Sequence, residues 1–174
     1  MNKQRVRRII WWLTASALLI AVLTATFYKP APKDEGLGLV VSILNYADEP
    51  LGLVYVNDSW AGGMSSHRGG SSIAGSVGVP SKWRPGLTIT VHWQDDELYK
   101  KDRDGLHVAE VPIEPYTGDF PSILYLAFFP GKKIKAYPSS YTPQHPDFPD
   151  GLDRPDTMCK ADPACKAKFF RLKD

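Results

Sequence analysis

The chain of 174 residues contains 21 Lys and Arg against 19 Asp and Glu, a formal charge of +2. The excess lies in residues 1–29, which hold five basic residues and no acidic one, so the remainder carries a formal charge of −3. Because that remainder has no net attraction for phosphate backbones, we expect no nucleic-acid partner, and its length of roughly 140 residues suits one domain.

The first element in chain order is a membrane anchor. Residues 9–28 contain no charged side chain, and a helix of that length spans about 30 Å, the thickness of a bilayer's hydrocarbon core. Basic residues precede this stretch and only Lys29 follows closely, so the positive-inside rule predicts a cytoplasmic basic stub over residues 1–8. We therefore predict a single-pass protein of a bacterial inner membrane with its C-terminal domain in the periplasm. A cleaved signal peptide is the alternative, with residues 24–26 as the nearest approach to a cleavage site.

Residues 29–38 combine Pro, Lys, Asp, Glu and Gly and predict a linker. Beyond it, short apolar stretches rich in β-branched and aromatic residues alternate with Gly and Pro, which predicts a mainly β domain over residues 39–174. We expect a β-sandwich or open barrel of about seven short strands. The stretch 123–129 is continuously apolar and predicts a central strand buried on both faces. The predicted strands cover residues 39–44, 53–56, 73–79, 87–93, 106–113, 123–129 and 133–137.

The connections carry their own signals. Asn57 and Asp58 separate two strand-like stretches and predict a tight hairpin. Residues 94–104 are dense in charges of both signs and predict a solvated loop. Residues 137–155 are rich in proline, so we expect them to wrap the domain surface in extended form. One short helix is predicted across residues 161–171.

Cys159 and Cys165 are the two cysteines of the chain. The periplasm is an oxidising compartment, so a pair this close in sequence predicts a disulfide. A loop this short restrains the unfolded chain by only about 2 kcal/mol, so we expect the disulfide to fasten the C-terminal segment. A metal site or a redox-active pair is the alternative, although the chain lacks a Cys-x-x-Cys motif.

Compact catalytic signatures are absent from the sequence. The segment 75–78 is one residue too short for a nucleophile elbow, and no phosphate-binding loop or His-Glu-x-x-His helix is present. The four histidines do not pair at metal-ligand spacing, although a site assembled in space is left open. The acidic residues near 95–97 and 110–114 are interpreted as solvated surface charge. We therefore predict no enzyme, no catalytic residue, no metal site and no cofactor.

Large side chains at predicted loop positions indicate a binding function more clearly than any motif indicates a catalytic one. Trp60 adjoins a Gly-Gly pair, and Trp83 precedes an Arg-Pro-Gly turn. Trp, Tyr and Arg dominate the energetics of protein interfaces, although for each tryptophan a role in the core is the alternative. We expect the loops 60–70 and 141–150 to contact a partner. The predicted partner-binding residues are Trp60, Arg68, Trp83, Arg84, Tyr141, His145 and Phe148.

Over residues 39–149 the chain resembles a family of small bacterial envelope proteins of unknown function. Members are frequently encoded beside phospholipase effectors of the type VI secretion system, and some are regarded as the matching immunity proteins. The helical anchor of this chain is a variation on that family, which implies no catalytic residues. The motifs that carry the resemblance are Val54-Tyr55-Val56-Asn57, Trp60-Ala61-Gly62-Gly63, Val79-Pro80, Lys82-Trp83-Arg84-Pro85-Gly86-Leu87, Val91-His92-Trp93, Phe128-Phe129-Pro130-Gly131 and His145-Pro146-Asp147-Phe148-Pro149.

The resemblance implies a membrane-anchored periplasmic protein that neutralises a secreted lipase effector by direct binding. The alternative expectation is a cell-envelope interaction protein that contacts peptidoglycan or a secretion component. An unrecognised hydrolase is the third hypothesis, which the missing motifs weaken.

Overall fold

The computed structural model of the chain describes residues 36–170. The predicted stub, the predicted anchor over residues 9–28 and most of the predicted linker lie outside the described residues. Among residues 36–170, no helix combines the length and apolar character that crossing a bilayer requires.

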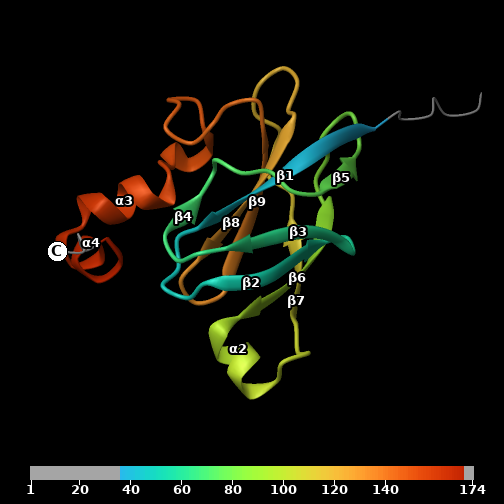
Figure 1. The fold of residues 1–174 in the computed structure, drawn as a ribbon. Helices are drawn as coiled ribbons and strands as arrows, with labels where there is room; N and C mark the ends of the chain where they lie inside the picture. Colours follow the sequence, from blue (N-terminus) through green and yellow to red (C-terminus); the bar gives the residue numbers. More distant parts are fainter. Residues whose placement is uncertain (1–35, 171–174) are drawn as a thin grey trace, which may run out of the picture. The chain divides into compact units, whose positions relative to one another are not determined.

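Two β-sheets face each other in a sandwich-like arrangement (Figure 1). The larger sheet is formed by β1 (Leu37–Asn45), β4 (Arg68–Gly69), β5 (Ser76–Val79), β8 (Ile123–Phe129) and β9 (Lys133–Ser139). The smaller sheet is formed by β2 (Leu51–Val56), β3 (Ser59–Met64), β6 (Thr88–Asp95) and β7 (His107–Pro112). The short helices are α2 (Asp96–Lys101), the 3-10 turn η1 (Pro149–Gly151), α3 (Pro155–Ala161) and α4 (Pro163–Phe169).

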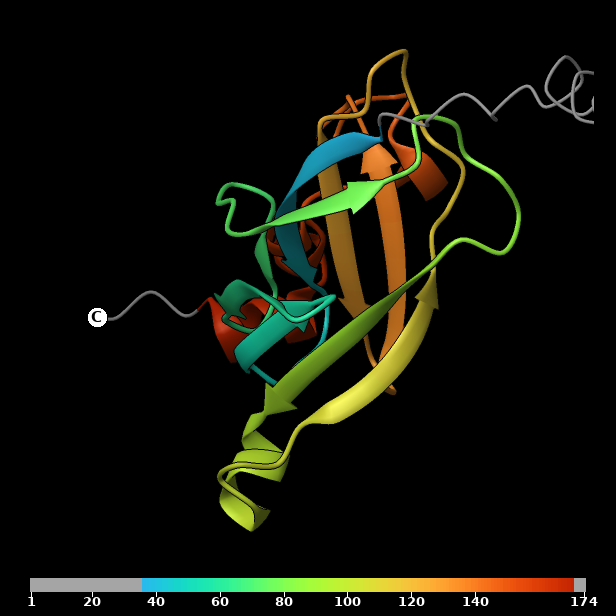
Figure 2. The ribbon, with the colours of Figure 1, turned by 90° about the vertical axis from the view of Figure 1, so that its right-hand side faces the viewer.

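Strand order follows from local hairpins and one parallel pairing. In the smaller sheet the order is β3-β2-β6-β7 and all pairs are antiparallel. In the larger sheet β1 pairs with β8 in parallel, while β4 and β5 pair with the other edge of β1. Backbone bridges from Ile113 to Ala136 and from Thr117 to Ser139 tie the segment after β7 to β9. Figure 2 shows the long β6–β7 hairpin running beside the larger sheet and ending at α2.

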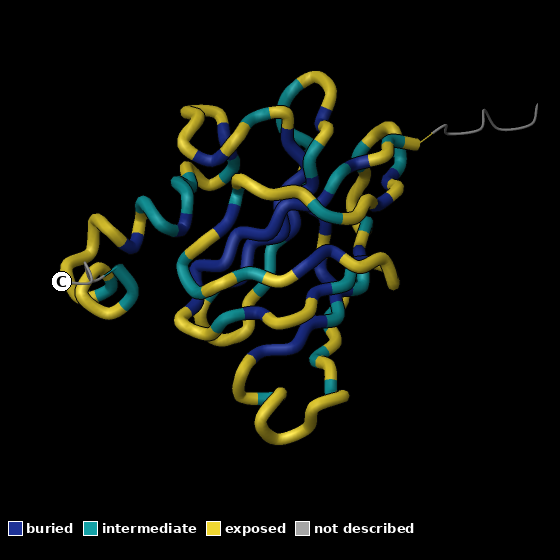
Figure 3. The backbone as a smooth tube through the Cα atoms, in the orientation of Figure 1, coloured by how far each residue is buried: buried dark blue, intermediate teal, exposed yellow. Residues whose placement is uncertain are grey.

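The main core lies between the sheets, where alternate residues of each strand point inward. Figure 3 shows that buried backbone is concentrated in the central strands, whereas the connecting loops and α2 are largely exposed. The central strand β8 was predicted to be buried on both faces, and the structure confirms this. Leu124 and Leu126 belong to the main core, whereas Tyr125 and Ala127 belong to a second cluster.

That second cluster covers the outer face of the larger sheet. The proline-rich segment after β9 crosses this face, and Phe148 packs edge-on against Tyr125 with ring centroids 5.1 Å apart. The hydroxyl of Tyr46 donates to the carbonyl of Asp153, which fixes the segment further along. The segment therefore covers the domain surface as predicted, but it is not extended. The backbone N–H groups of His145 and Phe148 donate to the carbonyls of Thr142 and His145, which closes two turns before η1.

The hairpin and the disulfide agree with the sequence analysis. Asn57 and Asp58 both have positive φ, 45° and 65°, which is the conformation of a type I′ turn. Cys159 and Cys165 form a disulfide that joins α3 to α4. Because the two helices meet at Asp162-Pro163, the bond closes a sharp corner of the C-terminal segment.

Three expectations about local structure were incomplete. Residues 94–104 are not only a solvated loop, because Asp95 caps the N-terminus of α2. The helix predicted across residues 161–171 corresponds to α4, and α3 precedes it. The strands β3 and β4 were not predicted, because glycine-rich sequences such as theirs carry little strand propensity.

Candidate partner-binding site

The outer face of the smaller sheet carries a row of aromatic and apolar side chains, of which Trp60 and Val108 are exposed and Tyr55 and His92 are half-buried. In the strand registers Tyr55 lies opposite Trp60 and His92, and His92 lies opposite Val108. Directly opposed residues on one face of a sheet have Cβ atoms about 5 Å apart, so these four side chains are neighbours in a line across all four strands. We call Trp60, Tyr55, His92 and Val108 the cross-strand row.

The cross-strand row is accessible to a partner. The exposed fractions of Trp60 and Val108 are 56% and 62%, so no other part of the described chain covers them. Leu53, on the same strand as Tyr55, is 37% exposed. Beside the row, the hydroxyl of Thr90 donates to the carboxylate of Glu110 at 2.6 Å. An apolar centre with a polar border is the usual composition of a protein interface.

Of the two expected anchors Trp83 and Arg84, only Arg84 is exposed. Trp83 is only partly exposed, packs against the main core and donates its indole N–H to the carbonyl of Ile113 at 2.8 Å. Its role is therefore to hold the turn before β6 against the segment after β7, the alternative that the sequence left open. Arg84 is exposed on that turn.

The expectation that Phe148 is an exposed anchor is corrected by its burial. Only 2% of Phe148 is exposed, because the ring fills the second cluster between Tyr125 and Tyr137. Its neighbour His145 is exposed, whereas Tyr141 is half-buried against the same cluster. The rings of Tyr141 and His145 stack at 4.3 Å with an interplanar angle of 15°. Sequence reasoning missed the burial because the proline-rich segment has no periodic pattern from which a covered face could be read.

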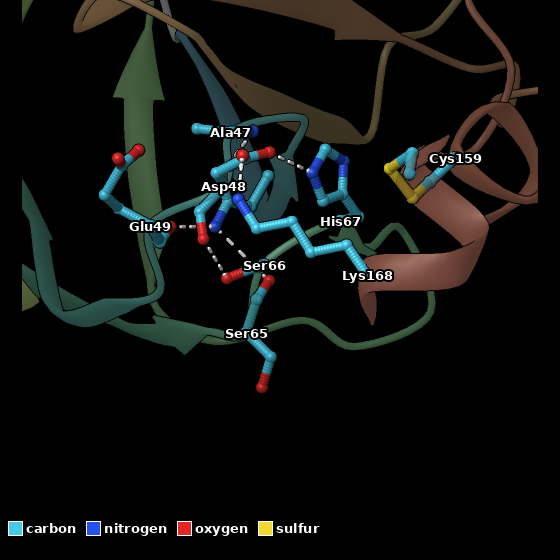
Figure 4. Close-up of polar contacts among 10 residues, drawn as sticks. Ala47, Asp48, Glu49, Ser65, Ser66, His67, Cys159 and Lys168 are labelled. Carbon is cyan, nitrogen blue, oxygen red and sulfur yellow. Dashed lines mark hydrogen bonds and ion pairs between the residues drawn. A yellow bond between two sulfur atoms is a disulfide. The ribbon is translucent and has the colours of Figure 1, made fainter. Parts of the chain in front are cut away.

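Arg68 belongs to a different neighbourhood, at the contact between β4 and the C-terminal helices. Its guanidinium lies over the ring of Phe170, 4.2 Å from the centroid. Beside it, His67 Nε2 lies 2.7 Å from Asp48 Oδ1, and Lys168 Nζ donates to Asp48 Oδ2 at 2.6 Å (Figure 4). The hydrogen bonds from Lys168 and His67 hold the pKa of Asp48 below its usual range.

The predicted binding residues therefore do not form one patch. Trp60 lies on the outer face of the smaller sheet, whereas Arg68 lies beside the C-terminal helices. The two predicted loops do approach each other, because a Cβ built on Gly70 would lie 3.6 Å from Pro143. Tyr55, His92 and Val108 were missed by the sequence analysis. The alternating pattern around residues 88–93 was the available signal, since it places His92 on the wet face of a strand.

A small pocket opens where the two sheets end near α2. Its volume is about 200 Å³, and its apolar lining includes Leu51, Trp93 and Phe128. Asp95 and Lys132 supply charge at its edge. No hydroxyl or thiol side chain is among the described residues that line it. The pocket can therefore take an apolar group beside a charge, and it offers no Ser, Thr or Cys nucleophile.

Asp95 is the most constrained acidic group of this pocket. The interpretation of Asp95 as solvated surface charge was wrong, because its side chain is 6% exposed. One carboxylate oxygen accepts from the backbone N–H of Leu98, and the other lies 3.0 Å from His107 Nε2 and 3.8 Å from Lys132 Nζ. Burial alone would raise the pKa of Asp95, but the Leu98 hydrogen bond and His107 lower it below the ordinary value.

We predict that Asp95→Ala lowers the free energy of unfolding by about 1–2 kcal/mol at pH 7, because α2 loses its cap and His107 its partner. A depressed folded-state pKa contributes stability above the unfolded pKa of about 4, and that contribution disappears as the pH falls through the folded value. The difference in the free energy of unfolding between wild type and Asp95→Ala should therefore be smaller at low pH than at pH 7. Urea denaturation at pH 7 and pH 3 measures it.

Asp95→Asn is the matched control for this prediction. Asparagine retains the capping oxygen but not the charge, so the variant should lie between wild type and Asp95→Ala at pH 7. Equal losses for both variants at pH 7 would show that the charge, rather than the cap, carries the effect. An unchanged unfolding free energy for Asp95→Ala would contradict the prediction.

One set of side chains among residues 36–170 has ligand atoms close enough to hold a metal ion. These are His67, Cys159 and Cys165, whose ligand atoms lie within 4.8 Å of one another. While the two sulfur atoms are bonded to each other they are not thiolate ligands.

A family model matches residues 44–136, which is more than half of the chain. The chain belongs to the family described as protein of unknown function (DUF3304). No curated protein and no solved structure matches the chain. The DUF3304 region contains the whole cross-strand row, whereas the proline-rich segment that buries Phe148, the disulfide and α4 follow it.

Proposed function

We propose that this DUF3304 protein is an immunity protein of the bacterial envelope. It neutralises a phospholipase effector of the type VI secretion system by binding it directly, without consuming a substrate. The resemblance of residues 39–149 to envelope proteins encoded beside such effectors supports the choice of partner. The cross-strand row supports binding as the mode of action, and it is the observation that carries the proposal.

The chemistry of the row suits protein contact. Indole and phenol rings bury 150–250 Å² each, as a general estimate, and combine an apolar body with a polar group. Trp60 and Tyr55 lie on paired strands, so the sheet holds them in place before a partner arrives and little conformational entropy is lost on binding. A standard interface covers about 800 Å² of each partner, so the row forms its centre and the surrounding strand residues its border.

The proposed location adds to the effect of this surface. A membrane anchor over residues 9–28 holds the domain in a thin layer at the inner membrane, where a phospholipase finds its substrate. Confinement to this layer raises the effective concentration of the inhibitor against an enzyme at the same membrane. An exported, anchor-free form should therefore still bind the effector, but more of it should be needed for protection.

The test is co-expression with a genetically linked phospholipase effector that is directed to the periplasm. Wild type should protect the cells and bind the purified effector. The double variant Tyr55→Ala, Trp60→Ala should lose protection. If each of the two side chains contributes about 2 kcal/mol to binding, the dissociation constant of the double variant for the effector should be about 1,000-fold higher than that of wild type.

Tyr99→Ala and Phe120→Ala provide the matched control. Both residues are exposed aromatics, 49% and 82% exposed, and neither belongs to the cross-strand row. This control should bind as wild type does, and circular dichroism should show that both double variants remain folded. Unchanged binding by the Tyr55, Trp60 variant would remove the row as the interface. Failure of the wild-type protein to bind or protect against any linked effector would overturn the proposed function in favour of an envelope-interaction role.

A further inference from the structure

Three metal-ligand side chains meet at the contact between the turn before β4 and the C-terminal helices. His67 comes from that turn, Cys159 from α3 and Cys165 from α4. Their ligand atoms lie within 4.8 Å of one another, although His67 is far from the cysteines in sequence. The fold therefore assembles a donor set that no local sequence motif encodes.

His67 is oriented for metal binding by its surroundings. Its side chain is 12% exposed, and its ring lies against Phe169 with centroids 4.5 Å apart. Figure 4 shows the imidazole between the Asp48 carboxylate and the disulfide. Nε2 lies 2.7 Å from Asp48 Oδ1, which leaves Nδ1 as the nitrogen for a metal. Metal-binding histidines in proteins typically donate their other N–H to a carboxylate in this way.

The turn that presents His67 is held in a conformation that costs energy. His67 has a φ of 49°, in the left-handed region that few non-glycine residues adopt. The next two residues form β4, where Gly69 packs directly on the backbone of Ile43. The backbone at His67 is thus held by the pairing of β4 with β1, and its ring also contacts Phe169 of α4.

We propose that reduction of the Cys159–Cys165 disulfide turns this cluster into a Zn²⁺ site with His67, Cys159 and Cys165 as ligands. Thiolate and imidazole are ligands that zinc prefers, in tetrahedral geometry. Tetrahedral thiolates at about 2.3 Å from zinc lie roughly 3.7 Å apart, so each sulfur moves by less than about 1 Å from its place in a disulfide. When the two cysteines are oxidised, the disulfide joins α3 to α4. When they are reduced, the zinc ion joins the same two helices.

The reduction consumes one dithiol. A dithiol protein or small molecule supplies two electrons and two protons, the S–S bond breaks, two cysteine thiols form, and the donor becomes a disulfide. Zinc binding then releases the two thiol protons to solvent, because thiolates are the ligands. The two thiolates neutralise the charge of Zn²⁺, and the nearby ammonium of Lys168 is already paired with Asp48.

The three proposed ligand residues line a surface pocket of about 180 Å³. The described residues lining it include both cysteines, His67, Met158 and Asp162. Three protein ligands with one open position is the arrangement that leaves a water or an exogenous group on zinc. We therefore expect the fourth ligand to come from this pocket.

The experiment uses the full-length chain, reduced with a phosphine under anaerobic conditions and titrated with Co²⁺ as a probe for zinc. We expect one equivalent to bind, with thiolate-to-cobalt charge-transfer absorption and the visible bands of tetrahedral cobalt. Zn²⁺ should displace it, and Mg²⁺ should not. The oxidised chain should bind no cobalt at this site, since it has no thiolate.

Two variants separate the site from adventitious thiol binding. Asp48→Asn should lower zinc affinity about 10–100-fold, the usual effect of losing the carboxylate behind a metal-binding histidine. His67→Asn keeps a residue that tolerates positive φ and should lower affinity further. Asp147→Asn is the matched control, because Asp147 lies 3.8 Å from the exposed His145, and it should change nothing. Unaltered affinity in His67→Asn, or no charge-transfer band in the reduced wild type, overturns the proposal.

Discussion

Replacing Phe148 by alanine is expected to lower the free energy of unfolding by about 3–5 kcal/mol, the usual cost of removing a buried phenylalanine. The ring is 2% exposed and contacts Tyr125 and Tyr137 on the outer face of the larger sheet. It is the fully buried aromatic residue of the proline-rich segment, and Tyr141 and Leu152 pack against the same cluster. Without the ring, a cavity remains between Tyr125 and Tyr137. The segment also loses an apolar contact whose free energy offsets the entropy cost of ordering its backbone. Urea denaturation gives the loss of stability.

The expected damage is local as well as global. Because the segment after β9 is anchored by Phe148, the variant should be cut within residues 140–154 by a protease at a concentration that leaves wild type intact. Phe120→Ala is the control, since Phe120 is 82% exposed and its loss should change stability by less than about 0.5 kcal/mol. A loss below 1 kcal/mol for Phe148→Ala would contradict the prediction, because it would show that the other apolar contacts and the hydrogen bonds of the segment hold it without this ring.

Gly69→Ala is expected to destabilise the protein by about 3 kcal/mol or more. Gly69 has a φ of 135°, and a Cβ added there would lie 2.0 Å from the carbonyl oxygen of Ile43. That oxygen belongs to the backbone of β1, so it cannot rotate away as a flexible side chain would. Relief requires β4 to separate from β1. Thermal and urea unfolding measure the loss.

Gly131→Ala separates backbone strain from this clash. Gly131 also has positive φ, 77°, but a Cβ there would meet nothing within 4 Å. Its replacement should cost only the left-handed backbone term of roughly 1–2 kcal/mol. Equal losses at the two positions would contradict the argument, because they would show that β4 adapts to the added methyl group without cost.

The β-rich class of the domain could be predicted because most of its strands have a recognisable pattern of apolar and β-branched residues over a few consecutive positions. The apolar run over residues 123–129 predicted β8 and its burial on both faces. Asn57 and Asp58 predicted their turn, because two-residue hairpins demand positive φ. The disulfide followed from two nearby cysteines in a chain expected to be exported. The strand and turn inferences depend on residues within about ten positions of one another, and the disulfide inference adds the export predicted from residues 9–28.

The position of Phe148 and the chemistry of Asp95 could not be predicted in this way. Phe148 has no periodic neighbours, and only the packing of its segment on β8 and β9 decides that it is buried. Asp95 stands in a run of charges, and only the β6–β7 pairing brings His107 to its carboxylate. Burial and pairing of this kind depend on residues distant in sequence, so local composition does not report them.

In the cross-strand row, too, some features could be predicted from local sequence and others depend on the tertiary structure. The sequence by itself determined that His92 lies on a wet strand face and that Trp60 follows a hairpin. Only the tertiary structure decided that Trp60, Tyr55, His92 and Val108 stand in one line, because that depends on the registers of three strand pairs. A shift of one residue in any of these registers would turn a side chain to the opposite face of the sheet. Strand register is set by the packing of the whole core, and for that reason the binding surface appears only when the chain is folded.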